Sequence, residues 1–376
     1  MTDLADRIRL ARTDGVGPVT YRRLLREYPS AAAAIDALPA LARGAGRATP
    51  PRIPSVSDTA REMDRVAKIG GRMLVLGGPD YPPLLAMLTI APPVLTVLGD
   101  VTVFASRAVA LVGARNASAP GQRMAEALAA ELAAAGLIVV SGLARGIDTG
   151  AHTGALHTGR TVAAVAGGID IVYPPENDKL QRRITERGAI VAEAPFGTAP
   201  QARHFPRRNR IIAGLSLGVI VIEAALRSGS LITAQDAADM DRILFAVPGS
   251  PLDPRCRGSN DLLRQGAVLT ETAADVLAAL PPMPGPTATG LSEPQVPYGT
   301  DPDPAQVRAK LLQLIGFSPS PVDDLVRRCQ FSAAAVMAAI SDLEFASLVE
   351  MLPGNQVSLV PDTSFQGESD LMQRTP

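Results

Sequence analysis

The sequence predicts an α/β protein with a doubly wound, mostly parallel sheet, together with a small N-terminal helical domain and a small C-terminal module. Three observations predict the sheet. Short apolar runs alternate with amphipathic segments from about residue 70 to residue 280. Several runs are apolar at every position, as expected of strands covered on both faces. Small residues collect directly after the runs, at the edge where such sheets bind ligands.

The bulk properties of the chain narrow its class. Its 376 residues suit two or three domains, and its net charge of −1 means that a polyanion would need a local basic patch. Aromatic residues make up 3% and Trp is absent, which argues against a surface built mainly on base stacking. Cys256 and Cys329 lie far apart without CxxC spacing, so we expect neither disulfide nor metal site. With no signal peptide or bilayer-spanning run, we expect a cytoplasmic protein without membrane contact.

Residues 1–60 are predicted to form the helical domain, since their apolar residues recur at helical spacing. The turn between the first two predicted helices contains Gly15, Gly17 and Pro18. It resembles a helix-hairpin-helix motif, whose backbone amides can hold a DNA phosphate, and a small bundle used for protein contacts is an equal alternative. A Gly/Pro-rich stretch at 44–54 marks the boundary.

Eight apolar runs are the predicted strands of the central domain, residues 65–280. They cover residues 73–76, 94–98, 109–112, 138–140, 161–165, 189–192, 219–222 and 243–247. Five of them are followed by glycine-bearing turns, which indicates that a ligand approaches the backbone closely there. Arg115 and Arg145 would stand on the same rim. We expect binding by strand-end residues, namely Gly113, Arg115, Ser141, Gly142, Arg145, Gly168, Ser228, Gly229 and Ser230.

The segment 203–234 is the most basic part of this domain. Four guanidinium groups fall within eight residues, and residues 194–222 contain no Asp or Glu. A buried strand and the Ser-Gly-Ser turn at 228–230 follow, and the turn would open a helix whose free amides attract anions. A polyanion, nucleic acid first, is the predicted ligand, and a solvated basic face is the alternative. The expected contacts are Phe205, Arg207, Arg208, Asn209 and Arg210.

Dinucleotide binding is not predicted. The fingerprint requires G-x-G-x-x-G after the first strand, but here Arg115 stands at the position of the second glycine. Its side chain would obstruct the approach of a pyrophosphate to the backbone. We therefore expect no NAD and no other cofactor.

Catalysis is not predicted either, since the nucleophile elbow G-x-S-x-G is absent. Asp148 reads most simply as an N-cap, and His152 and His157 as packed or capping residues of one helix. Glu223 follows a buried strand and would hold an arginine or the Ser228 turn in place. The alternative from another class is a nucleotide-binding or nucleotide-hydrolysing enzyme, for which Glu223 is the candidate carboxylate.

The C-terminal part is predicted to be a tether and a module. Residues 281–304 are a Pro-rich linker, and 305–361 form three helices and a hairpin that resemble a winged helix. Its predicted recognition helix has no Lys or Arg but includes Asp342 and Glu344, so we expect protein contact or a weak accessory role rather than base reading. Residues 362–376 are expected to be disordered.

Taken together, the ordered motifs of residues 75–280 resemble the bacterial DNA-processing protein A family (DprA/Smf). The motifs are YPPLL at 81–85, VGAR at 112–115, SGLARGID at 141–148, His152, GID at 168–170, YP at 173–174, FPRRNR at 205–210, SGS at 228–230, TA at 233–234 and PG at 248–249. Ala114 departs slightly from the family, where Ser often holds this position.

This resemblance implies an extended Rossmann-like domain that binds and protects single-stranded DNA. It also implies loading of the RecA recombinase during DNA uptake, natural transformation and recombination, with no established catalytic reaction. In this chain the implied DNA contacts are Arg115, Arg207, Arg208 and Arg210. Family members act as dimers, so the segment 265–269 and the helix 271–280 would form a pairing edge in a homodimer, with an ordinary closing strand as the equal alternative.

Overall fold

The computed structural model describes residues 3–44, 49–283, 303–352 and 355–360. Its chain divides into two compact units, which are described separately. The first consists of Met1–Arg12, Ser30–Ala32 and Ile53–Leu291, and the second of Thr13–Pro29, Ala33–Arg52 and Ser292–Pro376. Within the described residues, no helix combines the length and the apolar character needed to span a membrane.

The first unit is built on a nine-stranded sheet with the order β1-β2-β6-β5-β4-β3-β7-β8-β9. Strands β3 to β9 run parallel to one another, whereas β2 is antiparallel to both β1 and β6. The predicted mostly parallel sheet is therefore confirmed. The strands are β1 (Arg72–Val75), β2 (Val94–Gly99), β3 (Ala108–Gly113), β4 (Ile138–Ser141), β5 (Thr161–Val165), β6 (Ala189–Ala192), β7 (Gly218–Ile222), β8 (Ile243–Ala246) and β9 (Val268–Leu269).

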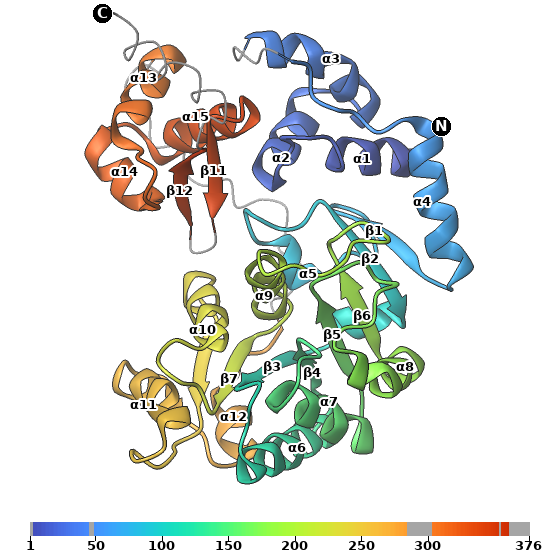
Figure 1. Ribbon diagram of the computed structural model, residues 1–376, viewed down its shortest axis with the longest axis vertical. Helices are drawn as coiled ribbons and strands as arrows, with labels where there is room; N and C mark the ends of the chain where they lie inside the picture. Colours follow the sequence, from blue (N-terminus) through green and yellow to red (C-terminus); the bar gives the residue numbers. More distant parts are fainter. Residues whose placement is uncertain (1–2, 45–48, 284–302, 353–354, 361–376) are drawn as a thin grey trace, which may run out of the picture. The chain divides into compact units, whose positions relative to one another are not determined.

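Helices cover both faces of this sheet, which is why its central strands are apolar at every position (Figure 1). On β3, Val109 and Leu111 pack toward α6 (Ala119–Ala134), α7 (Ile147–Thr158) and α12 (Ala273–Ala279). Ala110 and Val112 face the other way, toward α9 (His204–Gly214) and α10 (Gly229–Asp239). The remaining elements of this unit are α1 (Asp3–Ala11), α4 (Val56–Lys68), α5 (Pro83–Ala86), η1 (Val101–Ala105), η2 (Pro175–Asn177), α8 (Asp178–Arg187), η3 (Pro254–Cys256) and α11 (Arg257–Arg264).

The turn between β4 and α7 is held from inside by Asp148. The prediction that Asp148 is an N-cap is wrong, because α7 begins at Ile147 and its N-cap is Gly146, at φ 75°. The Asp148 carboxylate instead accepts hydrogen bonds from the backbone amides of Gly142 and Ala144, each at 3.2 Å. These two bonds fix the backbone of the turn that follows β4.

His152 is a structural residue, as predicted. It is fully buried, its Nε2 accepts a hydrogen bond from the Leu143 amide at 3.3 Å, and its Nδ1 lies 2.7 Å from Thr161 Oγ1. Burial lowers the pKa of His152 to about 3, and the nearby Arg208 cation contributes. His157, expected to be packed or capping, is half exposed, with Nδ1 3.8 Å from the Glu126 carboxylate.

The second unit contains the C-terminal module, whose predicted three helices and hairpin are confirmed. Its small sheet has the order β10-β12-β11, and an apolar core joins the three helices to it. The elements of the module are α13 (Pro304–Leu314), β10 (Ser320–Pro321), α14 (Val322–Cys329), α15 (Ala333–Phe345), β11 (Val349–Leu352) and β12 (Gln356–Leu359). The second unit also contains α2 (Pro18–Glu27) and most of α3 (Ala31–Gly44). Most of the predicted linker (284–302) and the predicted disordered tail lie outside the described residues.

Candidate nucleic-acid interface

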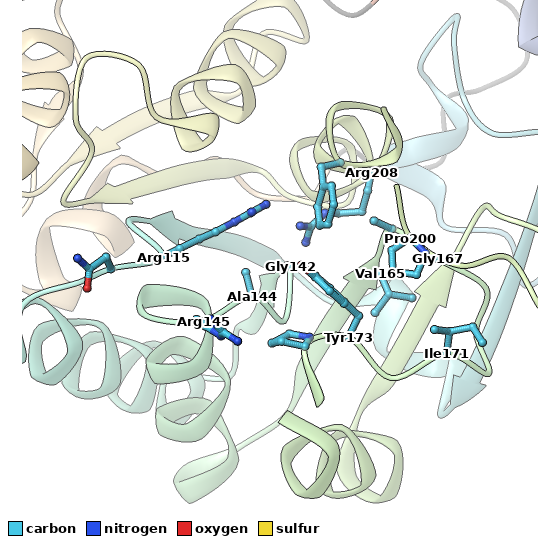
Figure 2. A pocket seen from close by; sticks show the side chains of 14 residues that line it. Arg115, Gly142, Ala144, Arg145, Val165, Gly167, Ile171, Tyr173, Pro200 and Arg208 are labelled. Carbon is cyan, nitrogen blue, oxygen red and sulfur yellow. The ribbon is translucent and has the colours of Figure 1, made fainter. Parts of the chain in front are cut away.

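A cavity of about 360 Å³ lies beyond the carboxyl ends of β4 and β5 (Figure 2). Four loops and helix α9 supply its wall, and Figure 2 draws 14 residues that line it. Among these described lining residues none is Asp or Glu, so the wall carries positive charge. They are Arg115, Asn116, Gly142, Ala144, Arg145, Val165, Ala166, Gly167, Ile171, Tyr173, Pro174, Pro200, Phe205 and Arg208.

Five of the residues expected to bind are brought together in this cavity although they are distant in sequence. The strand-end turns contribute Arg115, Gly142 and Arg145, and α9 contributes Phe205 and Arg208. In Figure 2 the Arg115 side chain reaches from the β3–α6 turn toward Arg208. The parallel sheet explains this meeting, because all its strand ends share one edge.

Two guanidinium groups lie against one aromatic ring in the cavity. Cζ of Arg115 is 4.8 Å from the centroid of the Phe205 ring, and Cζ of Arg208 is 5.9 Å from it. Both distances permit a cation–π interaction. The Phe205 ring in turn meets Tyr173 at 5.8 Å between centroids and an interplanar angle of 58°. The wall therefore combines apolar ring surface with positive charge.

Arg208 is the buried member of the pair, with a relative exposure of 5%. Its Nη1 donates to the Ala164 carbonyl at 3.1 Å, and its buried Nε has no hydrogen-bond partner among the described residues. Burial lowers the pKa of Arg208 to about 10, with Asp148 opposing and Arg115 adding to the shift, so the group stays cationic at neutral pH. A Cβ on Gly142 would overlap Arg208 Nη1, which explains the glycine at this strand end.

The other two arginines of the cavity differ in their partners. Arg145 is exposed and forms an ion pair with Glu176. For Arg115, the described part of the chain supplies no carboxylate partner, and its guanidinium rests on the Phe205 ring. Arg115 is therefore the cation that a ligand would meet without displacing an acid.

The structure places three further predicted residues behind the cavity wall. Gly113 ends β3 where a Cβ would overlap the carbonyl of Ile222 on β7. Ser141 is fully buried, and its Oγ donates to the Leu111 carbonyl at 2.6 Å. Gly168 packs closely against the loop after β6. Each of these residues shapes the backbone and does not line the cavity.

The remaining predicted residues also lie outside the cavity lining. The Arg210 guanidinium donates to the Ile90 carbonyl and to the Glu193 carboxylate, the latter at 2.5 Å. Arg207 is exposed, and Asn209 Nδ2 donates to the Gly229 carbonyl at 3.2 Å. Ser228, Gly229 and Ser230 open α10, where the Ser228 side chain accepts from the Ser230 amide.

Tyr173 and Pro200 line the cavity but were not among the predicted site residues. Both come from irregular loops, whose path is not indicated by apolar periodicity. One signal was present for Tyr173, because the Tyr-Pro pair at 173–174 belongs to the ordered motifs of the resemblance.

Comparison with known proteins identifies the family of the domain that contains this cavity. The family model described as "DNA recombination-mediator protein A" matches residues 72–281. The chain belongs to this family. Two models for flanking domains also match, a "DprA-like N-terminal HHH domain" at residues 2–64 and a "DprA winged helix domain" at residues 295–355. The resemblance stated from the motifs is thereby confirmed.

Members of the DNA recombination-mediator protein A family resemble this chain over most of their length. Protein Smf of Escherichia coli is 37% identical over 287 residues, which is 74% of this chain and 75% of that protein. The solved structure of DNA processing protein A (DprA) from Streptococcus pneumoniae has 38% identity and a TM-score of 0.57, covering 61% of this chain and 79% of its own. The protein from Helicobacter pylori, whose structure concerns its single-stranded DNA binding mode, has 29% identity and a TM-score of 0.51, covering 55% and 94%.

Proposed function

We propose that this chain binds single-stranded DNA in the cavity of Arg115, Phe205 and Arg208 and acts in DNA processing. The observation that carries the proposal is the pair of guanidinium groups on one aromatic ring, in a cavity whose described lining contains no carboxylate. The related proteins called DNA processing proteins, and the single-stranded DNA binding mode of the Helicobacter pylori protein, support it.

The cavity suits a flexible strand better than a duplex. Arg115 and Arg208 would neutralise phosphates, while an unstacked base would rest on the Phe205 ring, a type of contact available to every base. Arg145 would also bind a phosphate once its ion pair with Glu176 is broken. Binding should therefore depend little on sequence and weaken with salt.

The wider role that we propose is protection of incoming strands and loading of the RecA recombinase during natural transformation, by a homodimer without catalytic activity. Two observations support a non-catalytic role. Glu223, the candidate carboxylate of a nucleotide hydrolase, is engaged by Ser118, and His152 is buried and neutral.

The decisive experiment is a salt titration of binding. Affinity for a labelled oligothymidylate would be measured by fluorescence anisotropy at several salt concentrations for the wild type and Arg115→Ala. We expect Arg115→Ala to weaken binding and to lower the log–log salt slope by roughly 0.7, the value for one phosphate contact on a single strand. Arg182→Ala is the matched control, since Arg182 is exposed on α8 and paired with Asp178.

Two results would overturn the proposal. One is failure of the wild-type protein to bind the oligonucleotide at low salt, or an affinity of Arg115→Ala that is no lower than that of Arg182→Ala. The other is release of base from nucleoside monophosphates incubated with the wild-type protein, which would indicate the enzyme alternative.

A further inference from the structure

Glu223 has an unusual backbone conformation at the end of β7. Its φ is 50°, in the left-handed region that residues with a Cβ rarely adopt, and its relative exposure is 9%. Such a conformation costs roughly 1 kcal/mol or more and persists only where other contacts impose it. The contacts of the Glu223 side chain are therefore the candidates for what imposes this conformation.

The Glu223 carboxylate occupies the N-terminus of α6. Oε2 accepts a hydrogen bond from the Ser118 amide at 2.8 Å, and Oε1 accepts one from the Ser118 hydroxyl, which itself accepts from the Gly121 amide at 2.9 Å. A Cβ on Gly121 would lie 2.5 Å from the Glu223 carboxyl carbon, so a glycine is needed for the carboxylate to enter. The expectation that Glu223 holds an arginine or the Ser228 turn is therefore replaced by a contact with α6.

The Glu223 carboxylate lies where dinucleotide-binding folds hold a phosphate group. In dinucleotide-binding folds the first strand–helix turn receives a pyrophosphate at the positive end of its helix. Here the corresponding end of α6 already holds an anion that belongs to the chain itself.

The same contact fixes one end of the turn that carries Arg115. Four residues, 114–117, separate Gly113 at the end of β3 from Ser118. The start of this turn is held by the Ile147 amide, which donates to the Ala114 carbonyl at 3.2 Å, and its end is held by Glu223. Arg115 lies between these two anchors, and its guanidinium is 4.8 Å from the Phe205 ring centroid.

We propose that Glu223 is a positioning residue for single-stranded DNA, which holds the 114–118 turn so that Arg115 faces the cavity. The inference rests on the proposed function. A second role, pairing with the nearby Arg255, is already filled by Asp253, whose carboxylate lies 2.7 Å from Arg255 Nη2. The structure thus leaves the anchoring of α6 and the 114–118 turn as the role of this carboxylate.

The sign of a mutational effect separates positioning from simple electrostatics. Glu223 is a negative charge close to a site for a polyanion, so Coulomb repulsion alone predicts that its removal strengthens binding. Positioning predicts the opposite, because the freed turn would no longer hold Arg115 over Phe205. The two accounts cannot both fit one measurement.

The test measures oligothymidylate affinity and salt slope for Glu223→Ala and Glu223→Gln. We expect Glu223→Ala to bind roughly tenfold more weakly, as for loss of one contact to a charged group, with a slope lower by roughly 0.7. Glu223→Gln keeps an oxygen that can accept from the Ser118 amide, so its loss should be smaller. Glu176→Gln is the matched comparison, since it removes another acid of the rim and should raise affinity, because it frees Arg145 for a phosphate.

A double-mutant cycle shows whether Glu223 acts through Arg115. In an Arg115→Ala background, Glu223→Ala should cause little further loss of affinity. If Glu223→Ala does not fold, judged by its urea transition, Ser118→Ala replaces it, because that change removes the hydroxyl donor without changing charge. It should also weaken binding in the wild-type background and have little effect beside Arg115→Ala.

The outcomes distinguish failure of this inference from failure of the proposed function. A wild-type protein that ignores the oligonucleotide contradicts the proposed function. Wild-type binding that is weakened by Arg115→Ala but unchanged or strengthened by the Glu223 variants contradicts the positioning role alone. Full additivity in the double mutant contradicts it as well.

Discussion

Two of the three arginines on helix α9, Arg208 and Arg210, face different regions of the first unit. Arg208 lines the cavity, and Asp148, the acid whose charge acts on it, accepts hydrogen bonds from the amides of Gly142 and Ala144. Arg210 reaches Glu193 directly and forms an ion pair with it at 2.5 Å. An arginine of a basic segment is therefore available to a ligand when the local carboxylate is already engaged by backbone donors.

Replacing Arg208 by Ala should have the largest effect, on both stability and binding. The change removes the buried hydrogen bond from Arg208 to the Ala164 carbonyl and the positive charge that favours the ionised form of Asp148, and such a loss at a buried charged group typically costs about 3 kcal/mol. Urea unfolding should show this loss, and anisotropy should show weaker binding of single-stranded DNA. Arg208→Lys, which keeps the charge, should recover part of the stability. Unchanged stability in Arg208→Ala would mean that Asp148 does not depend on this cation.

The positions of these arginines were predictable from the sequence, but their partners were not. The strand ends were predictable from apolar runs and glycines, and with them the meeting of Arg115, Gly142 and Arg145. The ion pair of Arg210 was not predictable. Its partner Glu193 lies just before the acid-free stretch 194–222, and only the path of the loop after β6 brings Arg210 on α9 close to Glu193. The contact of Glu223 with Ser118 joins the ends of two strands and follows no local pattern.

Asp236, whose pKa Arg210 influences, should make the stability of the folded protein depend on pH. This residue is 5% exposed, and its Oδ2 has no hydrogen-bond partner among the described residues. Burial raises the pKa of Asp236 to about 7, Asp239 adds to the shift, and Arg210 opposes it. The folded protein therefore keeps a proton that the unfolded chain releases above about pH 4.

It follows that Asp236 makes the folded state less stable as pH rises from about 4 to about 7. Asp236→Asn cannot ionise, so its free energy of unfolding should exceed that of the wild type increasingly, by about 2–3 kcal/mol more at pH 8 than at pH 5. Urea unfolding of both proteins at several pH values measures this difference. A constant difference across that range would show that Asp236 has an ordinary pKa in the folded protein.

Arg210→Ala should have a smaller effect, confined to stability. The change removes hydrogen bonds to the Glu193 carboxylate and the Ile90 carbonyl, which together are worth about 1–2 kcal/mol at a partly exposed site. Because Arg210 does not line the cavity, the salt slope of single-stranded DNA binding should stay at the wild-type value. A slope lowered as in Arg115→Ala would place Arg210 on the DNA path and remove the contrast with Arg208.

The smallest effect is expected in the second unit, where α15 offers DNA no basic side chain. Asp342 on α15 forms an ion pair with Arg23 on α2, and beside it Ser341 Oγ and Thr20 Oγ1 form a buried contact at 2.9 Å. Both charged side chains are partly exposed, so Asp342→Asn should cost about 0.2–1 kcal/mol of stability. Asp324→Asn on α14, which removes an exposed ion pair with Arg327, is the matched control.

If α15 contacts protein and not DNA, neither variant should change affinity for duplex or single-stranded oligonucleotides by more than about twofold, because neither acid lies near a bound phosphate. A helix that entered a DNA groove would behave differently. Loss of the Asp342 charge would relieve repulsion and leave Arg23 with only its longer ion pair to Glu27, and both changes favour a polyanion. A severalfold gain in duplex affinity, specific to Asp342→Asn and reversed by salt, would therefore assign α15 to DNA and place a second contact surface outside the cavity.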